Sequence, residues 1–365
     1  MEKKLGFGCM RLPMKENQVD YEQFNKMIDL YMKEGFNYFD TAHGYIEGKS
    51  EIAIRECLVK RYPRESYVLT NKLTGTYFKT KEEIRPFFEK QLEHTGVKYF
   101  DYYLMHSQDR ENYLHFQKTN AYEIAHELKK EGKIKHLGIS FHDTAEILEK
   151  ILTEHPEIEI VQIQFNYIDF KNSSVQSEQV YNVCRKFNKP VLIMEPVKGG
   201  GLINLPEAAK KIFDDLGEEL SYASYAIRFA ASFEGVVKVL SGMSNLEQMQ
   251  DNITYMKEFK PLEEKEYKAI EKVTEILNNL GGIPCTACRY CVEGCPKKIS
   301  IPDLFGCYNA KVQFNDWNSD YYYGIHTKDN GKASDCIKCG KCEKVCPQHL
   351  PIRENLDKVA KTFEK

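Results

Sequence analysis

The sequence has no long apolar run, and this excludes one class of protein at the outset. No stretch of the 365 residues approaches the roughly 18 consecutive apolar residues that a membrane-spanning helix requires. The opening stretch, MEKKLGFGCM, has two lysines but no apolar segment of the kind found in a secretory signal. We therefore expect a soluble, cytoplasmic protein that makes no use of a membrane.

An excess of charge of either sign is also missing. The formal net charge is −3, and the charged residues are spread along the chain rather than gathered in blocks. A nucleic-acid surface would need a basic patch, which this distribution does not supply. With 42% hydrophobic residues the chain can nevertheless bury a sizeable core, and its length indicates one large domain with a smaller appendage.

The glycine pattern of an open dinucleotide-binding sheet is absent as well. No G-x-G-x-x-G sequence follows an expected strand, and the glycines at 199–201 and 281–282 have the wrong spacing. Instead, short β-rich stretches alternate with amphipathic ones up to about residue 260. Eight such units in about 250 residues favour an α/β fold of the closed (β/α)8 type. The expected strands are 5–10, 36–41, 66–73, 100–107, 134–140, 160–166, 190–197 and 236–243.

Helical spacing fills the intervals between these strands. In 21–35, for example, Phe24, Met27, Ile28 and Tyr31 fall on one helical face. Similar patterns predict helices over 82–96, 121–132, 177–188 and 262–280. Two glycines end the last of these patterns and are followed by Ile283-Pro284, which predicts a domain boundary. We expect the barrel to occupy residues 1–282 and a second domain to occupy residues 283–365.

Cysteine is plentiful, but its placement speaks against disulfides. Eight of the twelve cysteines fall in CTACRYCVEGCP (285–296) and CIKCGKCEKVCP (336–347), and the other four are scattered and read as buried thiols. Both runs have the C-x2-C-x2-C-x3-C-P spacing that binds a [4Fe–4S] cluster. Structural zinc on four cysteines is the alternative, but it would leave the third cysteine of each run unexplained.

The ferredoxin rule assigns ligands to two clusters, because the fourth cysteine of each run ligates the other cluster. One cluster is therefore expected on Cys285, Cys288, Cys291 and Cys346, and the other on Cys336, Cys339, Cys342 and Cys295. Pro296 and Pro347 are expected to turn the chain after each run. The helix-like insert at 301–312 and a short charged helix at 352–364 predict a mostly helical ferredoxin-like domain.

Ionisable residues gather at the expected carboxyl ends of three barrel strands, where catalytic groups of this fold lie. Asp40 and then Tyr45 follow the second strand, Lys72 lies in the third and His106 in the fourth. Together Lys72 and Asp40 would lower the phenol pKa of Tyr45 from about 10 towards neutrality, so that it donates a proton. Asp40 would hold the Lys72 ammonium, and His106 would hold a carbonyl oxygen.

The segments FNYFDTAHGY, VLTNK and DYYLMHS resemble the signatures of the aldo-keto reductase family, in order and at fitting intervals. The resemblance covers about residues 4–260 and implies a barrel that reduces a small aldehyde or ketone by hydride transfer from NADP(H) or NAD(H). It implies the same four residues as a catalytic tetrad. The cysteine runs make the chain similar to a branch of the family with a C-terminal ferredoxin-type domain.

The resemblance also implies positions that contact the nicotinamide cofactor. Ser140 and Gln162 would bind the carboxamide, and Met194 replaces an aromatic residue that often stacks on the nicotinamide. The loop after the seventh strand, including Pro196, Val197, Gly199 and Gly200, would wrap the pyrophosphate. The adenosine-phosphate positions are Ser241, Gly242, Met243, Gln248 and Asn252. Gln248 stands where NADPH-preferring members often carry arginine, so the choice between NADPH and NADH stays open.

Nicotinamide transfers two electrons as a hydride, whereas each cluster transfers one, and this leaves three interpretations. The barrel is a self-sufficient carbonyl reductase whose clusters stabilise the second domain or dock a partner. Alternatively, the clusters relay electrons between a ferredoxin-like partner and a substrate or further cofactor in the barrel. In the third interpretation the chain is an electron-transfer or sensing module on a disused barrel, which the intact tetrad argues against. His43, near the barrel mouth, is interpreted as an ordinary loop residue, with contact to the substrate as the alternative.

Overall fold

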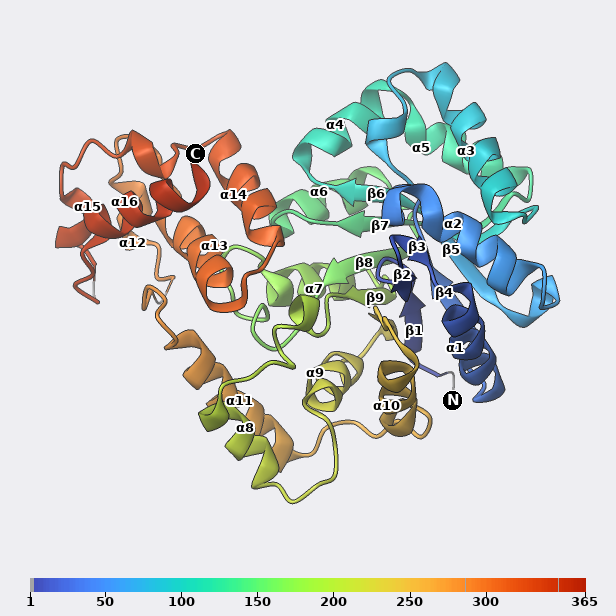
Figure 1. The fold of residues 1–365 in the computed structure, drawn as a ribbon. Helices are drawn as coiled ribbons and strands as arrows, with labels where there is room; N and C mark the ends of the chain where they lie inside the picture. The colour runs from blue at the N-terminus through green and yellow to red at the C-terminus, as the bar shows by residue number, and fades with distance from the viewer. Residues whose placement is uncertain (1–2, 286, 347) are drawn as a thin grey trace. The chain divides into compact units, whose positions relative to one another are not determined.

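The computed structural model describes residues 3–285, 287–346 and 348–365. Within the first of these ranges, eight parallel strands close into a barrel in the order β1-β10-β9-β8-β7-β6-β5-β4 (Figure 1). The fold class expected from the sequence is confirmed. The strands are β1 (Leu5–Gly8), β4 (Tyr38–Asp40), β5 (Val68–Leu73), β6 (Phe100–Gln108), β7 (Ile134–Phe141), β8 (Ile160–Gln164), β9 (Val191–Met194) and β10 (Val236–Ser241).

The barrel strands are apolar on both faces because helices cover them outside and side chains fill them inside. All five residues of β8 are buried, for example. One interior layer takes a residue from each of five strands: Tyr38, Leu104, Ile160, Leu192 and Leu240. Gly138 of β7 has no side chain, so its backbone packs directly against Leu104 and Ile160 of this layer.

Amphipathic helices surround the strands, and α1 (Tyr21–Lys33) shows why the sequence forms them. Asp20 caps its N-terminus by accepting a hydrogen bond from the Gln23 amide, and the four residues predicted to share a face are the buried ones. Figure 1 shows α1, α3, α5 and α10 outside the strands. The remaining helices of this part of the chain are α2 (Lys49–Ile54), α3 (Lys81–Thr95), α4 (Arg110–Lys118), α5 (Ala121–Lys130), α6 (Ala145–Glu154), α7 (Ser177–Lys186), α9 (Tyr222–Ala231) and α10 (Leu246–Met256).

A small hairpin that the sequence analysis did not predict follows β1. Its strands are β2 (Met14–Lys15) and β3 (Gln18–Val19), which pair antiparallel. Glu16 and Asn17 form the turn, and both have positive φ, at 49° and 62°. Two consecutive left-handed residues are the requirement of a type I′ turn.

The chain divides into two compact units. The first contains residues 1–165, 179–196 and 223–262, and the second contains 166–178, 197–222 and 263–365. The domain boundary at residue 282 stays a prediction from the sequence. Helices of the second unit are α8 (Glu207–Asp214), α11 (Glu264–Asn278), α12 (Tyr290–Glu293), α13 (Ile301–Phe314), α14 (Asn318–Lys328), α15 (Lys341–Lys344) and α16 (Ile352–Phe363).

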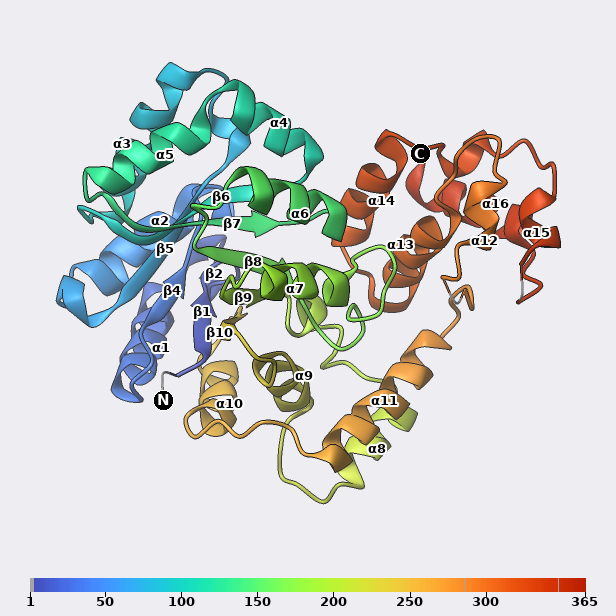
Figure 2. The same cartoon turned by 180° about the vertical axis from the view of Figure 1, so that it is seen from behind.

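The C-terminal part of the second unit has its own core. Helices α13, α14 and α16 lie together in both views, and α13 contacts the other two (Figure 2). Leu304, Phe305, Tyr322 and Val359 are buried between them. The mostly helical character predicted for this segment is confirmed, whereas Pro347 lies outside the described residues. No helix of the described chain is long and apolar enough to cross a membrane.

Candidate active site

Asp40 and Lys72 meet at the carboxyl ends of adjacent strands, β4 and β5. The Lys72 Nζ lies 2.6 Å from Asp40 Oδ1 and donates to the Thr41 carbonyl oxygen at 2.9 Å. Lys72 has no exposed surface, and Asp40 is also buried. A buried charge is tolerated only when it is paired and hydrogen-bonded, and this lysine meets both conditions.

Tyr45 completes the coordination of the same ammonium. Tyr45 is the first residue of the short turn η1 (Tyr45–Gly48). Its backbone amide donates a hydrogen bond to the Ala42 carbonyl oxygen. The Lys72 Nζ donates to the Tyr45 hydroxyl oxygen at 3.0 Å and lies 4.7 Å from the ring centroid. The oxygen of the half-buried phenol therefore accepts a hydrogen bond from the Lys72 ammonium, and its own proton can be donated to another acceptor.

His106, on β6, lies beside this phenol rather than in contact with its oxygen. The two ring centroids are 6.2 Å apart with the planes at 77°. His106 Nδ1 and Thr74 Oγ1 are 2.7 Å apart. Burial, followed by the charge of Lys72, lowers the pKa of His106 well below its usual value, so the imidazole is neutral at physiological pH. The structure thus brings all four predicted residues together.

The protonation of the group differs in one respect from the sequence prediction. Burial raises the pKa of Tyr45 above its ordinary value, and the Lys72 ammonium only opposes this effect. The expectation of a phenol pKa near neutrality was therefore wrong for the protein alone, because desolvation outweighs the cation. Burial lowers the pKa of Lys72, but Asp40 and Tyr45 outweigh it and raise the pKa, so the ammonium stays charged.

Two of the predicted nicotinamide contacts are neighbours in the barrel. Ser140 and Gln162 are register partners on β7 and β8, and both are buried. The Ser140 hydroxyl oxygen accepts from the Ser107 amide at 2.7 Å, and the Gln162 amide donates to Asp40 Oδ2 at 3.4 Å. Met194 ends β9 and is half-buried. These side chains therefore belong to the same strand ends as the ionisable group.

The predicted adenosine-phosphate residues lie where β10 leads into α10. Asn252 donates to the Ser241 hydroxyl oxygen at 2.7 Å, and the Asn245 side chain caps α10 by accepting from the Gln248 amide at 2.8 Å. The Gln248 side-chain oxygen accepts from the Ser244 amide at 2.7 Å. Gly242 and the buried Met243 form the connecting segment. The α10 terminus is thus already capped by the chain's own side chains.

The predicted pyrophosphate loop is divided between the two compact units. Pro196 belongs to the first, whereas Val197, Gly199 and Gly200 belong to the second. Both glycines have positive φ, at 63° and 103°, and a methyl group on Gly200 would meet nothing within 4 Å.

The eight motif cysteines of the second unit surround two hollows. One is lined by Cys295, Cys336, Cys339 and Cys342. The other is lined by Cys285, Cys288, Cys291 and Cys346. The rest of each lining is largely apolar, and Cys288 and Cys339 are the exposed members. Each hollow is lined by three cysteines of one run and the fourth cysteine of the other run, as expected for a two-cluster ferredoxin. Four thiols placed in this way are a donor set that suits a [4Fe–4S] cluster.

Two residues near the barrel site escaped the sequence analysis. Thr74, one residue after β5, is the partner of His106, and a lone threonine after a strand carries no motif signal. Arg11 lies beside Gly242, because a methyl group there would be 3.9 Å from the Arg11 guanidinium nitrogen Nη1. Only the folded chain brings this early residue to the segment that precedes α10.

A closed parallel barrel thus brings an acid, a lysine and a tyrosine into contact at its strand ends. Residues 4–275 match the family model of the aldo/keto reductase family, and residues 284–350 match that of the 4Fe-4S dicluster domain. The chain belongs to the aldo/keto reductase family and carries a 4Fe-4S domain at its C-terminal end.

Relatives of known sequence are distant but span most of the barrel. The chain is similar to the uncharacterized oxidoreductase YqkF of Bacillus subtilis, with 25% identity over 74% of this chain and 92% of that protein. It is also similar to the NADH-specific methylglyoxal reductase of Escherichia coli, with 24% identity over 60% of this chain and 78% of that enzyme.

Solved structures show the same barrel. The holo form of the aldo-keto reductase AKR11C1 from Bacillus halodurans superposes with a TM-score of 0.61 at 25% identity, covering 74% of this chain and 91% of that one. An aldo-keto reductase from Klebsiella pneumoniae in complex with NADPH gives 0.61 at 19% identity, covering 75% and 95%. At the latter identity the likeness concerns the fold alone.

Proposed function

We propose that the barrel reduces a small aldehyde or ketone with NADPH or NADH and that Tyr45 donates the proton to the carbonyl oxygen. The observation that carries this proposal is the buried contact series from Asp40 through the Lys72 ammonium to the Tyr45 hydroxyl, at 2.6 Å and 3.0 Å. A cation on the oxygen of a phenol stabilises the phenolate that forms as the proton leaves.

The chain's own residues would divide the work of proton transfer. Asp40 holds Lys72 charged and in place, and Lys72 bears on the Tyr45 oxygen so that the hydroxyl proton points to the substrate. With Thr74 donating to Nδ1, the neutral His106 would carry its proton on Nε2 and donate it to the same carbonyl oxygen. Tyr45 recovers its proton from solvent after the alcohol leaves.

A bound nicotinamide would supply the hydride that adds to the carbonyl carbon. Ser140, Gln162 and Met194 would hold its ring, since they share the strand ends with the ionisable group. Pro196, Val197, Gly199 and Gly200 are proposed for the pyrophosphate, and Ser241, Gly242, Met243, Gln248 and Asn252 for the adenosine end.

The adenosine end also has a cation within reach. The α10 amides are already capped, so a phosphate there would need a charged side chain, and the Arg11 guanidinium beside Gly242 would provide one. The name of the Escherichia coli relative indicates NADH, whereas the Klebsiella pneumoniae structure contains NADPH. Both cofactors therefore belong in the assay.

The test is replacement of Tyr45 by phenylalanine, which removes only the hydroxyl. We expect kcat/KM for carbonyl reduction to fall by at least about 100-fold, the usual contribution of a general acid, while cofactor binding stays unchanged. Methylglyoxal and 4-nitrobenzaldehyde are suitable first substrates. Iron content and the visible absorption of the clusters serve as the control for folding, and undiminished turnover in this variant would refute the role of Tyr45.

In the second unit we propose two [4Fe–4S] clusters, one in each cysteine-lined hollow. The exposure of Cys288 and Cys339 supports a second candidate function, because it would leave one corner of each cube open to a ferredoxin-like electron-transfer partner. The relay interpretation then predicts that Cys288→Ser and Cys339→Ser abolish turnover driven by reduced ferredoxin. The reductase interpretation predicts that both variants, if folded, keep NAD(P)H-driven turnover.

A further inference from the structure

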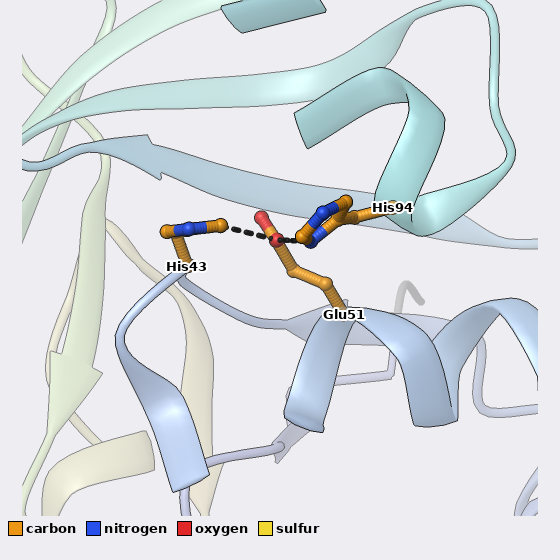
Figure 3. Close-up of side chains that lie close together, drawn as sticks. All are labelled: His43, Glu51 and His94. Carbon is orange, nitrogen blue, oxygen red and sulfur yellow. Dashed lines mark hydrogen bonds and ion pairs between the residues drawn. The ribbon is translucent and has the colours of Figure 1, made fainter. Parts of the chain in front are cut away.

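Three side chains with metal-binding atoms converge in the first unit, at a place that the proposed reduction does not use. His43 follows β4, Glu51 lies in α2 and His94 lies near the end of α3. The candidate ligand atoms all lie within 4.8 Å of one another. Figure 3 shows the Glu51 carboxylate between the two imidazoles, with both rings turned towards it.

One oxygen of Glu51 faces both histidines. Its Oε2 is 2.7 Å from His43 Nδ1 and 3.3 Å from His94 Nδ1. The first contact is a hydrogen bond, but the His94 Nδ1 is buried and makes no hydrogen bond within the described residues. A buried ring nitrogen that makes no hydrogen bond can offer its lone pair to another ligand when the ring proton is on Nε2.

The other oxygen of Glu51 is already satisfied by amide donors. Oε1 accepts from Asn71 Nδ2 at 2.8 Å and from Gln91 Nε2 at 3.3 Å. Hydrogen bonds of this kind fix a carboxylate that ligates a metal and set which oxygen is presented. Glu51 has no exposed surface, so its negative charge needs a partner inside the protein. One imidazole would be enough for a hydrogen bond to Oε2, yet two imidazoles face this oxygen.

We propose that His43, Glu51 and His94 bind a zinc ion through His43 Nδ1, Glu51 Oε2 and His94 Nδ1. Two histidines and one glutamate form an established zinc ligand set, which leaves a fourth position for water. Tetrahedral ligands 2.0–2.1 Å from zinc lie about 3.3 Å apart, which is the present separation of His94 and Glu51. The His43 contact must widen by about half an ångström as zinc replaces its proton.

The surroundings suit entry and retention of such an ion. The rings of Tyr77 and Phe87 pack edge-on against His43, with centroids at 4.8 Å and 5.1 Å, and restrict its rotation. The His94 side chain is 28% exposed, which gives the ion a path from solvent. The site is therefore closed on the His43 side and open on the His94 side.

Zinc here would stabilise the neighbouring candidate active site. His43 is two residues from Tyr45, and the Asn71 and Gln91 amides that hold Glu51 also engage the backbone of Lys72. Asn71 Oδ1 accepts from the Lys72 amide at 2.8 Å, and Gln91 Nε2 donates to the Lys72 carbonyl oxygen at 3.0 Å. An ion on Glu51 would thus tie the loop after β4, α2 and α3 to the strand that carries the lysine.

The experiment measures zinc bound to anaerobically purified full-length protein with its clusters filled, after equilibration with micromolar zinc chloride. We expect wild-type protein to bind one zinc more per chain than His94→Ala, a variant that should fold because His94 is a partly exposed helix residue. His136→Ala is the matched control, because His136 Nδ1 lies 3.1 Å from Glu159 Oε1 but belongs to no three-ligand group among the described residues. This control should bind as much zinc as wild type.

Zinc X-ray absorption on the wild-type protein provides a readout that needs no variant. The proposal requires nitrogen and oxygen ligands at about 2.0–2.1 Å, whereas zinc in emptied cluster sites would show sulfur at about 2.3 Å. Zinc should also raise Tm in wild type and His136→Ala but not in His94→Ala. Equal zinc binding in wild type and His94→Ala, or sulfur as the principal ligand, would overturn the proposal.

Discussion

At the scale of single residues, the charge of Lys72 depends on Asp40, because no solvent reaches the ammonium. We predict that Asp40→Asn lowers the free energy of unfolding by about 3–5 kcal/mol, the cost of leaving a buried charge without its partner. Without Asp40, burial would bring the pKa of Lys72 below its unfolded value. Between pH 7 and 9 Lys72 of the variant would then be protonated in the unfolded state but neutral in the folded state, so the free energy of unfolding should rise with pH. In wild type Lys72 is protonated in both states, so it adds no slope in this window.

Urea unfolding at pH 7, 8 and 9 measures both effects. Asp143→Asn is the matched control, since Asp143 is a buried acid 3.0 Å from Arg110, which remains charged throughout this range. The control should lose stability without acquiring the alkaline slope. An Asp40→Asn variant whose stability does not change between pH 7 and 9 would contradict the assigned role of Asp40.

His142 makes a second prediction at this scale. Burial, followed by the Lys72 charge, lowers the pKa of His142 to about 4. A depressed pKa means that the stabilising contribution is complete above pH 6.5 and is lost as the pH falls towards 4. Wild-type stability should therefore decline from pH 6.5 to pH 5 more steeply than that of His142→Gln, by up to about 1.4 kcal/mol per pH unit. Chemical unfolding in matched buffers tests this, and parallel curves would contradict it.

Most of the candidate site was predictable from residue type and position, because a parallel barrel places its strand ends at one edge. Asp40 ends β4, Tyr45 follows it, and Lys72 and His106 lie within the last three residues of β5 and β6. The grouping of His43 with Glu51 and His94 was not predictable, since His94 is more than forty residues distant and on another helix. The phenol pKa was misjudged because the degree of burial is a property of the fold.

At the scale of secondary-structure elements, β7 can pack between β6 and β8 only because residue 138 is glycine. A methyl group there would lie 2.6 Å from Leu104 Cδ2, 2.6 Å from Ile160 Cγ2 and 2.7 Å from the Ile160 carbonyl oxygen. We predict that Gly138→Ala lowers the free energy of unfolding by about 3 kcal/mol, since a backbone oxygen cannot move aside cheaply.

The comparison is Gly324→Ala in α14, where a methyl group would meet nothing within 4 Å. This substitution should be neutral or stabilising by up to about 1 kcal/mol, as alanine is the better helix former. Thermal or urea unfolding of the two variants measures the difference. A Gly138→Ala protein as stable as wild type would contradict the close contact of residue 138 with Leu104 and Ile160.

All eight barrel strands were predicted at this scale because short β-rich stretches alternate with amphipathic helical patterns along the chain. Six strands are shorter than predicted, and β9, for example, spans Val191–Met194 within the expected 190–197, whereas β6 and β7 each extend one residue further than predicted. The hairpin of β2 and β3 was missed, since its strands have two residues each and its turn, Glu16-Asn17, lacks the glycine that usually marks a type I′ turn.

At the scale of the whole molecule, the two cysteine-lined hollows make a prediction about iron. Anaerobically purified protein should contain about eight irons and eight acid-labile sulfides per chain, the content of two [4Fe–4S] clusters. Cys339→Ser should lower the iron content towards about four, because it removes one ligand of only one cube. Elemental analysis with low-temperature EPR of the reduced protein measures this, and zinc in place of iron would contradict the assignment.

At this scale we propose that the barrel reduces carbonyls with NAD(P)H without passing those electrons through the clusters. The most direct test mixes anaerobic, cluster-replete protein with NADPH, or NADH, and methylglyoxal or 4-nitrobenzaldehyde, and follows absorbance at about 340 nm and about 400 nm together. We predict that the nicotinamide signal decays with substrate while the cluster absorption stays constant. Bleaching of the cluster absorption in step with NADPH oxidation would contradict the claim and favour the relay of single electrons.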